Sequence, residues 1–254
     1  MPRTLTIYGD TKIAVVLAAA FALLAAAAVP FILQVVPPEA RTLPLPVPLF
    51  SLILALQSLI VYGLFALAGL RMARRRALDP APFLSGLWMR KLPDRIWIPL
   101  GISCGTGIFC GLLLFIIVSA IQRLAPHTLP QLLHPLSFEA ALLASAAASV
   151  GEEILCRLFA LSALLRILPV SPLSTFWAIL GSALIFGALH APAAVFLFGG
   201  LQSVPPVSWV WVIGLNGLVG IAFGALFIRY GIEGAILGHF GTDFVWHVIP
   251  RMLS

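Results

Sequence analysis

Three ionisable side chains lie within seven residues, Gly151 to Arg157, in the middle of an apolar run. Glu153 and Arg157 are four residues apart, so on a helix they are neighbours that can form an ion pair. Glu152 points about 100° round the same helix and has no local partner. An unpaired carboxyl group in such a setting is suited to act as a general base. The segment therefore predicts one reactive carboxyl, Glu152, beside a supporting ion pair.

Two later apolar runs each carry an imidazole at the depth of a membrane. Phe186 and His190 end one of these runs, and His239 and Asp243 lie one helical turn apart in the last one. At this spacing Asp243 can orient His239 or share a ligand with it. A lone histidine in an apolar helix is usually a packing residue. Two histidines with ionisable partners in separate runs instead predict that the groups converge on one cavity.

These side chains suit the activation of a water molecule. Two histidines and a glutamate can hold zinc with one open position for water. The same groups can position and deprotonate a water without a metal, and both possibilities stay open on the residues alone. The zinc-protease motif His-Glu-x-x-His and a Walker loop are absent from the sequence. Ser145 and Ser149 precede Glu152 with no histidine at helical spacing, which gives a serine nucleophile little support.

Other polar residues of the late runs have weaker interpretations. His127, His134 and His247 fall in loops or at the end of a run, and we interpret them as interfacial. Asn216 either makes a hydrogen bond across the bundle or lines its cavity.

The composition indicates the environment of these residues. Of 254 residues, 9% are charged and 61% are hydrophobic, and the mean hydropathy is +1.09. Soluble domains carry about 25% charged residues and could not bury this much apolar surface. The net charge of +6 does not indicate nucleic-acid binding, because the basic residues cluster between Arg71 and Arg95 in the manner of a cytoplasmic loop. The chain is predicted to be an integral membrane protein.

Seven apolar runs reach the roughly 17–25 residues that a membrane-spanning helix needs. They are Ile13–Val36, Leu45–Leu70, Ile96–Ile121, Phe138–Leu168, Leu173–Leu189, Val207–Ile228 and Ile232–Ile249. Residues 193–201 offer an eighth segment, either re-entrant or a broken extension of the preceding helix. The predicted fold class is an all-α, polytopic transmembrane helix bundle of about seven or eight spans, with a surface helix or loop at residues 71–95.

Basic residues also predict the orientation of the spans. If Arg71–Arg76 face the cytoplasm, alternation of the spans places the N-terminus, Arg166 and Arg229 on the same side. The loops at residues 37–44 and 122–136, which are poor in basic residues, then fall outside.

Three motifs, in order on separate runs, resemble the CAAX prenyl protease and bacteriocin-processing family of intramembrane proteases. The family pattern is Glu-Glu-x-x-x-Arg, then Phe-x-x-x-His, then His-x-x-x-Asn or Asp. The chain has Glu152-Glu153-x-x-x-Arg157, Phe186-x-x-x-His190 and His239-x-x-x-Asp243, and the likeness covers about residues 137–248. Within this family, the chain resembles the type II CAAX endopeptidases.

The resemblance implies a role for each matched residue. Glu152 would activate the attacking water with help from His190, and His239 and Asp243 would bind or polarise the scissile carbonyl and its oxyanion. Glu153, Arg157 and Phe186 would support the site. If a metal is used, it would be zinc, held by Glu152, His190 and His239. Asp243 stands where the eukaryotic members have Asn, and an ionised carboxylate there would oppose an oxyanion and favour a metal or a protonated state.

The same resemblance implies the function. The expected activity is that of an intramembrane endopeptidase, a metalloendopeptidase if zinc is used, on a membrane-associated or prenylated substrate. Its partners would be a peptide or lipidated protein and membrane lipid, with no nucleic acid. It would reside in the plasma membrane of a bacterium or the endoplasmic reticulum of a eukaryote. We expect a single membrane domain, with N-terminal spans and their basic loop at residues 1–130 and the catalytic core at residues 131–254.

Two other functions stay open on the residues. A non-catalytic immunity or scaffolding protein of the membrane could keep the motifs for the stability of its bundle. An ion-coupled transporter ranks lower, although carboxylates and histidines inside membranes also serve as proton relays.

Overall fold

Helices make up all the regular secondary structure in the residues that the computed structural model describes, which are 3–35, 45–92, 95–128 and 137–249. This confirms the predicted all-α class. The α-helices are α1 (Arg3–Val35), α2 (Val47–Arg74), α3 (Pro82–Trp88), α4 (Trp97–Leu124), α5 (Phe138–Glu153), α6 (Ser162–Ile167), α7 (Pro172–Leu189), α8 (Ala191–Leu197) and α9 (Pro206–Asp243). Two π-helical segments, Ile154–Leu161 and Phe244–Val248, follow α5 and α9, and a 3-10 turn, Leu201–Ser203, follows α8.

Serine and proline residues mark where several of these helices begin. The Ser137 hydroxyl accepts a hydrogen bond from the backbone of Ala140 at the start of α5, and Ser171 does the same at the start of α7. Prolines occupy the first turns of α3, α7 and α9, where the missing N–H has no acceptor within the helix. The boundaries of the helices therefore follow local signals in the sequence.

Within the described residues, five helical stretches are long and apolar enough to cross a membrane. They are Gly9–Leu33, Val47–Arg74, Trp97–Leu124, Pro172–Leu197 and Pro206–Val248. The predicted span Phe138–Leu168 is not among them, and it carries Glu152, Glu153 and Arg157 in its middle. These stretches support an integral membrane protein, and the number of spans stays a prediction.

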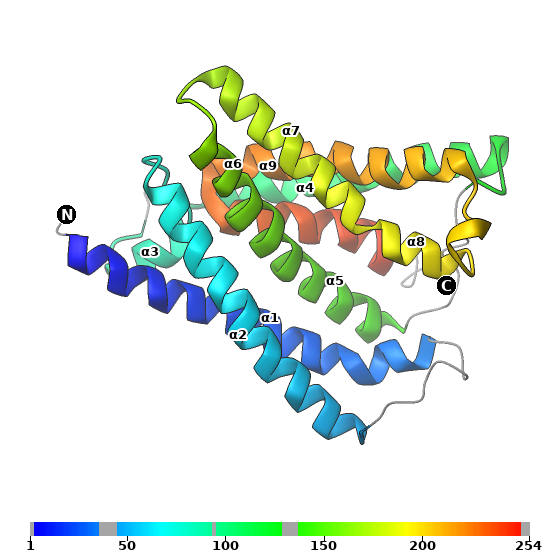
Figure 1. Cartoon of the computed structure of the whole chain (residues 1–254), viewed down its shortest axis with the longest axis horizontal. Coiled ribbons are helices and arrows are strands. Elements are labelled where there is room, and N and C mark those ends of the chain that lie inside the picture. The colour runs from blue at the N-terminus through cyan, green and yellow to red at the C-terminus, as the bar shows by residue number, and fades with distance from the viewer. Residues whose placement is uncertain (1–2, 36–44, 93–94, 129–136, 250–254) are drawn as a thin grey trace.

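The longest stretch consists of two helices joined at Gly231. The backbone leaves the helical region there, with φ 75° and ψ −171°, a conformation that glycine adopts without the steric cost of a Cβ. Figure 1 shows α9 running in one direction in orange and returning in red. The two halves correspond to the predicted runs Val207–Ile228 and Ile232–Ile249.

α5 and the π-helical segment after it lie in the middle of the bundle (Figure 1). α1 and α2 pack against each other and cover one side of this segment, and α7 and α9 pack against it from the other. α4 packs along α9, where Gly107 and Gly238 let the two backbones approach closely: a Cβ built on Gly107 would collide with the Gly238 carbonyl. The three cysteines are free thiols, of which Cys110 and Cys156 are buried.

Contacts between loops connect helix ends at each end of the bundle. At one end, the Arg76 guanidinium donates to the carbonyl of Leu168, and the backbone N–H of Ile232 donates to the carbonyl of Pro80 over 2.8 Å. At the other end, the Ser208 hydroxyl donates to the carbonyl of Thr128 over 2.6 Å. The segments grouped in this way are those that the basic residues predict to share a side of the membrane.

Candidate active site

A buried ion pair joins the two ends of the Glu-Glu-x-x-x-Arg motif. Glu153 Oε1 lies 3.1 Å from Arg157 Nη1, and both side chains are fully buried. Arg157 also donates through Nη2 to the carbonyl of Gly220 in α9 over 3.0 Å. Its guanidinium lies over the ring of Phe186 in α7, 4.3 Å from the ring centroid. The pair predicted from the spacing therefore exists, and Arg157 connects three helical segments.

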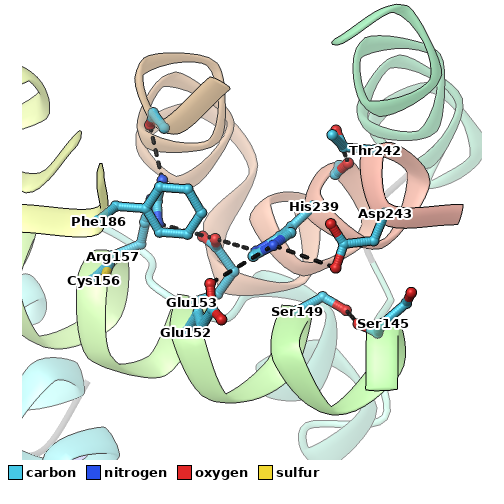
Figure 2. Close-up of polar contacts among 12 residues, drawn as sticks. Ser145, Ser149, Glu152, Glu153, Cys156, Arg157, Phe186, His239, Thr242 and Asp243 are labelled. Carbon is cyan, nitrogen blue, oxygen red and sulfur yellow. Dashed lines mark hydrogen bonds and ion pairs between the residues drawn. The ribbon is translucent and has the colours of Figure 1, made fainter. Parts of the chain in front are cut away.

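His239 lies at the centre of the site (Figure 2). Its Nδ1 is 2.9 Å from Glu153 Oε1, and its Nε2 is 3.7 Å from Asp243 Oδ2 and 4.0 Å from Glu152 Oε2. Because Glu153 is a carboxylate paired with Arg157, it can only accept, so Nδ1 of His239 carries a proton and donates it. The other nitrogen, Nε2, is left facing Glu152 and Asp243.

Aromatic rings hold the His239 imidazole in one plane. Phe223 stacks on it with ring centroids 4.8 Å apart and an angle of 15° between the planes. Phe186 meets the same imidazole edge to face, with centroids 5.4 Å apart, and contacts His190 in the same way at 4.9 Å. Rotation of His239 would break these contacts as well as its bond to Glu153. The imidazole is thus held before any substrate binds.

A cavity of about 270 Å³ opens beside these residues. Its apolar wall includes Leu114, Val118, Trp211, Leu215, Val219 and Trp246. Its polar wall includes Glu152, His190, His239, Asp243, Asn216 and His247. The Glu152 side chain is 35% exposed and that of Asp243 17%, whereas that of His239 is only 4% exposed. The four residues predicted to act in catalysis therefore line one cavity. Of Glu152, His239 and Asp243, Glu152 has the most exposed side chain.

His190 is held by its own helix. Its Nδ1 lies 2.9 Å from the carbonyl oxygen of Phe186, which can only accept a hydrogen bond. Nδ1 is therefore the protonated nitrogen. In the neutral ring, Nε2 is left as an acceptor in the cavity wall.

Several contacts of the site were not predicted from the sequence. The stacking of Phe223 on His239 and the use of the Gly220 carbonyl by Arg157 join residues far apart in the chain, and no spacing rule reveals them. Asn216 lines the cavity while its amide donates to the carbonyl of Val212 over 2.7 Å.

His247 lies in the cavity wall, although the sequence interpretation placed it at the membrane interface. In a regular α-helix His247 would be rotated about 80° away from His239. The segment Phe244–Val248 is π-helical, with i→i+5 hydrogen bonds and less rotation per residue, which returns His247 toward the face of His239. His134 lies outside the described residues.

Serine residues near the site are engaged in packing. Ser149 donates its hydroxyl proton to the carbonyl of Ser145 one turn earlier. Residues 101–105 have the spacing Gly-x-Ser-x-Gly, but Ser103 lies inside α4, fully buried, rather than on the strand-to-helix turn that the hydrolase motif requires. Neither arrangement supports a serine nucleophile.

The site does not have the form of a zinc centre. Zinc in enzymes takes three protein ligands at about 2.0–2.2 Å and keeps one position open. Among the described residues, no group of three or more His, Cys, Asp or Glu side chains is gathered closely enough to hold a metal ion. Glu152, His190 and His239 share a cavity without forming such a cluster, so we derive no step through a metal. Whether zinc takes part is a question for experiment.

A family model described as type II CAAX prenyl endopeptidase Rce1-like matches residues 134–245. The matched segment contains all three motifs and the residues around His239. The match agrees with the family resemblance of the motifs: over residues 134–245 the chain is similar to the type II CAAX prenyl endopeptidases. Comparisons with curated proteins and with solved structures gave no match. The family match supports a peptidase with CAAX endopeptidase activity in general, for which the substrate is a peptide or prenylated protein in a membrane.

Proposed function

We propose that the chain is an intramembrane endopeptidase that hydrolyses a peptide bond of a membrane-associated or prenylated substrate with water activated by Glu152. The observation that carries this proposal is the shared cavity of Glu152, His190, His239 and Asp243. A cavity with one carboxyl-rich wall and one apolar wall suits a peptide whose side chains or lipid are apolar.

The attacking water is assigned to Glu152 and His190. Glu152 is the carboxylate of the motif that reaches the cavity, and it has no partner on its own helix, so it is available to accept a proton. His190, with Nδ1 bound to the carbonyl of Phe186, offers Nε2 as an acceptor that orients the water. As the water oxygen bonds to the carbonyl carbon, its proton moves to Glu152.

The oxyanion is assigned to His239. Since Nδ1 already donates to Glu153, Nε2 can donate to an oxyanion only when both nitrogens carry protons. Glu152, Glu153 and Asp243 all lie within 4.0 Å of the ring nitrogens and can balance the charge of that imidazolium. In this scheme Asp243 acts through His239, which resolves the repulsion expected if its carboxylate faced the oxyanion alone.

Collapse of the tetrahedral intermediate completes the reaction. The bond between the carbonyl carbon and the amide nitrogen breaks, and the leaving nitrogen takes the proton held by Glu152. The products are a new carboxyl terminus and a new amino terminus, and the site returns to its initial protonation state.

Purified enzyme in detergent, mixed with an internally quenched peptide that ends in a farnesylated C-a-a-X sequence, tests the proposal. We expect cleavage by the wild type and none above background by Glu152→Ala. If the protein is a scaffold, neither the wild type nor Glu152→Ala will cleave the peptide, although both proteins fold. Because no step uses a metal, a chelator should change the rate by less than about twofold. Loss of activity that added zinc restores would contradict that part of the scheme.

A further inference from the structure

A short segment at one end of the bundle contacts both the N-terminal helices and the break in α9. We call residues 75–88, from the end of α2 through α3, the connector. It lies outside the residues that match the family model. Pro80 and Ala81 within it are fully buried, and Ala81 belongs to the same apolar core as Leu70 of α2 and Ile232 of α9. The connector is therefore a packed part of the bundle.

The N-terminal helices hold the connector through Arg74. Arg74 Nε lies 2.5 Å from Asp10 Oδ1 of α1, whose side chain is 4% exposed. The same guanidinium donates to the Ser85 hydroxyl over 3.1 Å and lies 3.6 Å from Asp79. Lys12 of α1 adds a cation–π contact, 3.8 Å from the ring centroid of Trp88. One arginine of the basic cluster thus has a structural role beside its role in orientation.

The connector in turn holds the residues on both sides of the break at Gly231. The break leaves backbone N–H groups without acceptors in a preceding turn, and the carbonyl of Pro80 accepts from Ile232 over 2.8 Å. Glu233 Oε1 accepts from the backbone N–H of Leu84 over 2.8 Å, in the first turn of α3, whose N-cap residue Ala81 has no side-chain acceptor. The start of α3 and the start of the helix after Gly231 therefore each supply an acceptor for a backbone N–H group of the other.

Glycine is required at the break for a second reason besides its positive φ. A Cβ built on Gly231 would collide with the ring of Pro82 and lie 3.0 Å from the carbonyl oxygen of Pro80. The connector thus packs directly on the backbone of the break, and the direction of the following helix depends on this contact.

The distance from the break to the site makes that direction important. His239 lies eight residues beyond Gly231, which is about 12 Å along a helix. A tilt of about 5° at the break would move the imidazole by about 1 Å, and errors of this size can lower a catalytic rate about 100-fold. The bond from His239 to Glu153 resists such a tilt at one end of this helix, and the connector resists it at the other.

From these contacts we infer that the connector positions the helix that carries His239 and Asp243, and that Glu233 is a positioning residue of the enzyme. The inference rests on the proposed function. Through Arg74, the N-terminal hairpin of α1 and α2 then contributes to the geometry of a site whose described cavity wall contains none of its residues.

Two pairs of matched variants test this inference with the farnesylated C-a-a-X peptide. Glu233→Gln keeps an oxygen that accepts from Leu84, whereas Glu233→Leu keeps the size and removes the acceptor. We expect Glu233→Gln to stay within about threefold of the wild type, and Glu233→Leu to lose about 10- to 100-fold in kcat with little change in KM.

The second pair removes the same hydrogen bond from its other partner. Leu84→Pro deletes the N–H in a first helical turn, where proline is tolerated, and Leu84→Ala removes packing but keeps the donor. A loss of kcat in Leu84→Pro that is absent from Leu84→Ala supports the inference even if Glu233→Leu does not accumulate. Wild-type kcat in both Glu233→Leu and Leu84→Pro, with Glu152→Ala inactive, overturns it and leaves the proposed function standing. Cleavage by Glu152→Ala would contradict the proposed function instead.

Discussion

At the scale of single residues, the site depends on a chain of contacts from Arg157 through Glu153 to His239. The positive charge of Arg157 and the negative charge of Glu153 offset one another in an interior that excludes water. Glu153 uses the same oxygen, Oε1, to fix the proton of His239 on Nδ1. The motif thus supplies two carboxylates with different tasks: Glu153 is buried and orients, and Glu152 reaches the cavity.

Removal of Arg157 tests this division of tasks through stability. Arg157→Met leaves Glu153 buried without its cation, and we expect the free energy of unfolding to fall by about 3–5 kcal/mol. Arg157→Lys keeps the charge but loses the planar fork that also reaches the Gly220 carbonyl, so its loss should be smaller. Denaturant unfolding in detergent measures both. Equal stability of Arg157→Met and the wild type would contradict the structural role of the pair.

Sequence spacing predicted only the contacts within one helix. Glu153 with Arg157 and His239 with Asp243 are i, i+4 pairs, and both are found at salt-bridge distance. The bond between Glu153 and His239 joins residues on α5 and α9, and it depends on how these helices pack. That packing is set by many small contacts and by glycine positions whose partners a single sequence does not reveal.

At the scale of elements, both helices that supply site carboxylates become π-helical immediately after them. Ile154–Leu161 follows Glu152 and Glu153, and Phe244–Val248 follows Asp243. π-helical turns are rare, well under 1% of residues, and are often found at functional sites. Each one shifts the faces of the residues beyond it, which explains why helical spacing placed Glu152 and Asp243 well but not His247.

The packing of α4 on α9 gives an element-scale prediction. Thr242, next to Asp243, donates to the carbonyl of Gly107 over 3.0 Å, and a Cβ on Gly107 would collide with the Gly238 carbonyl. Gly107→Ala should push the helices apart and lower kcat/KM at least about tenfold. Gly101→Ala is the matched control, because a Cβ there meets nothing within 4 Å. If both variants have wild-type activity, close approach of these helices does not position the site.

At the scale of the whole molecule, the helix ends form two groups that agree with the orientation predicted from the basic residues. Single cysteines in a variant lacking Cys104, Cys110 and Cys156 test the orientation. A cysteine at Arg75 should react with an impermeant maleimide only after the membrane is opened, whereas one at His127 should react in intact cells. The opposite pattern would reverse the orientation, and labelling of both positions in intact cells would show that the number of spans between them is wrong.

Much of the whole-molecule architecture was predictable because lipid demands long apolar runs, and prolines and glycines mark their ends. The runs at residues 207–228 and 232–249 correspond to the two halves of α9, on either side of Gly231. The contacts of the connector were not predictable, because they join residues about 150 positions apart, as in the bond of Leu84 to Glu233. The division into residues 1–130 and 131–254 stays a prediction.

The central claim is that Glu152 activates the water. The kcat/KM values of two matched glutamine variants, each relative to the wild type, test this claim most directly. Glu152→Gln keeps the size of the side chain but cannot accept the proton of the water, while Glu139→Gln makes the same change at an exposed position on the same helix. We predict that kcat/KM for the farnesylated peptide falls at least about 1,000-fold in Glu152→Gln, within the range of a lost general base, and less than about twofold in Glu139→Gln. Similar kcat/KM values for the two folded variants would contradict the account.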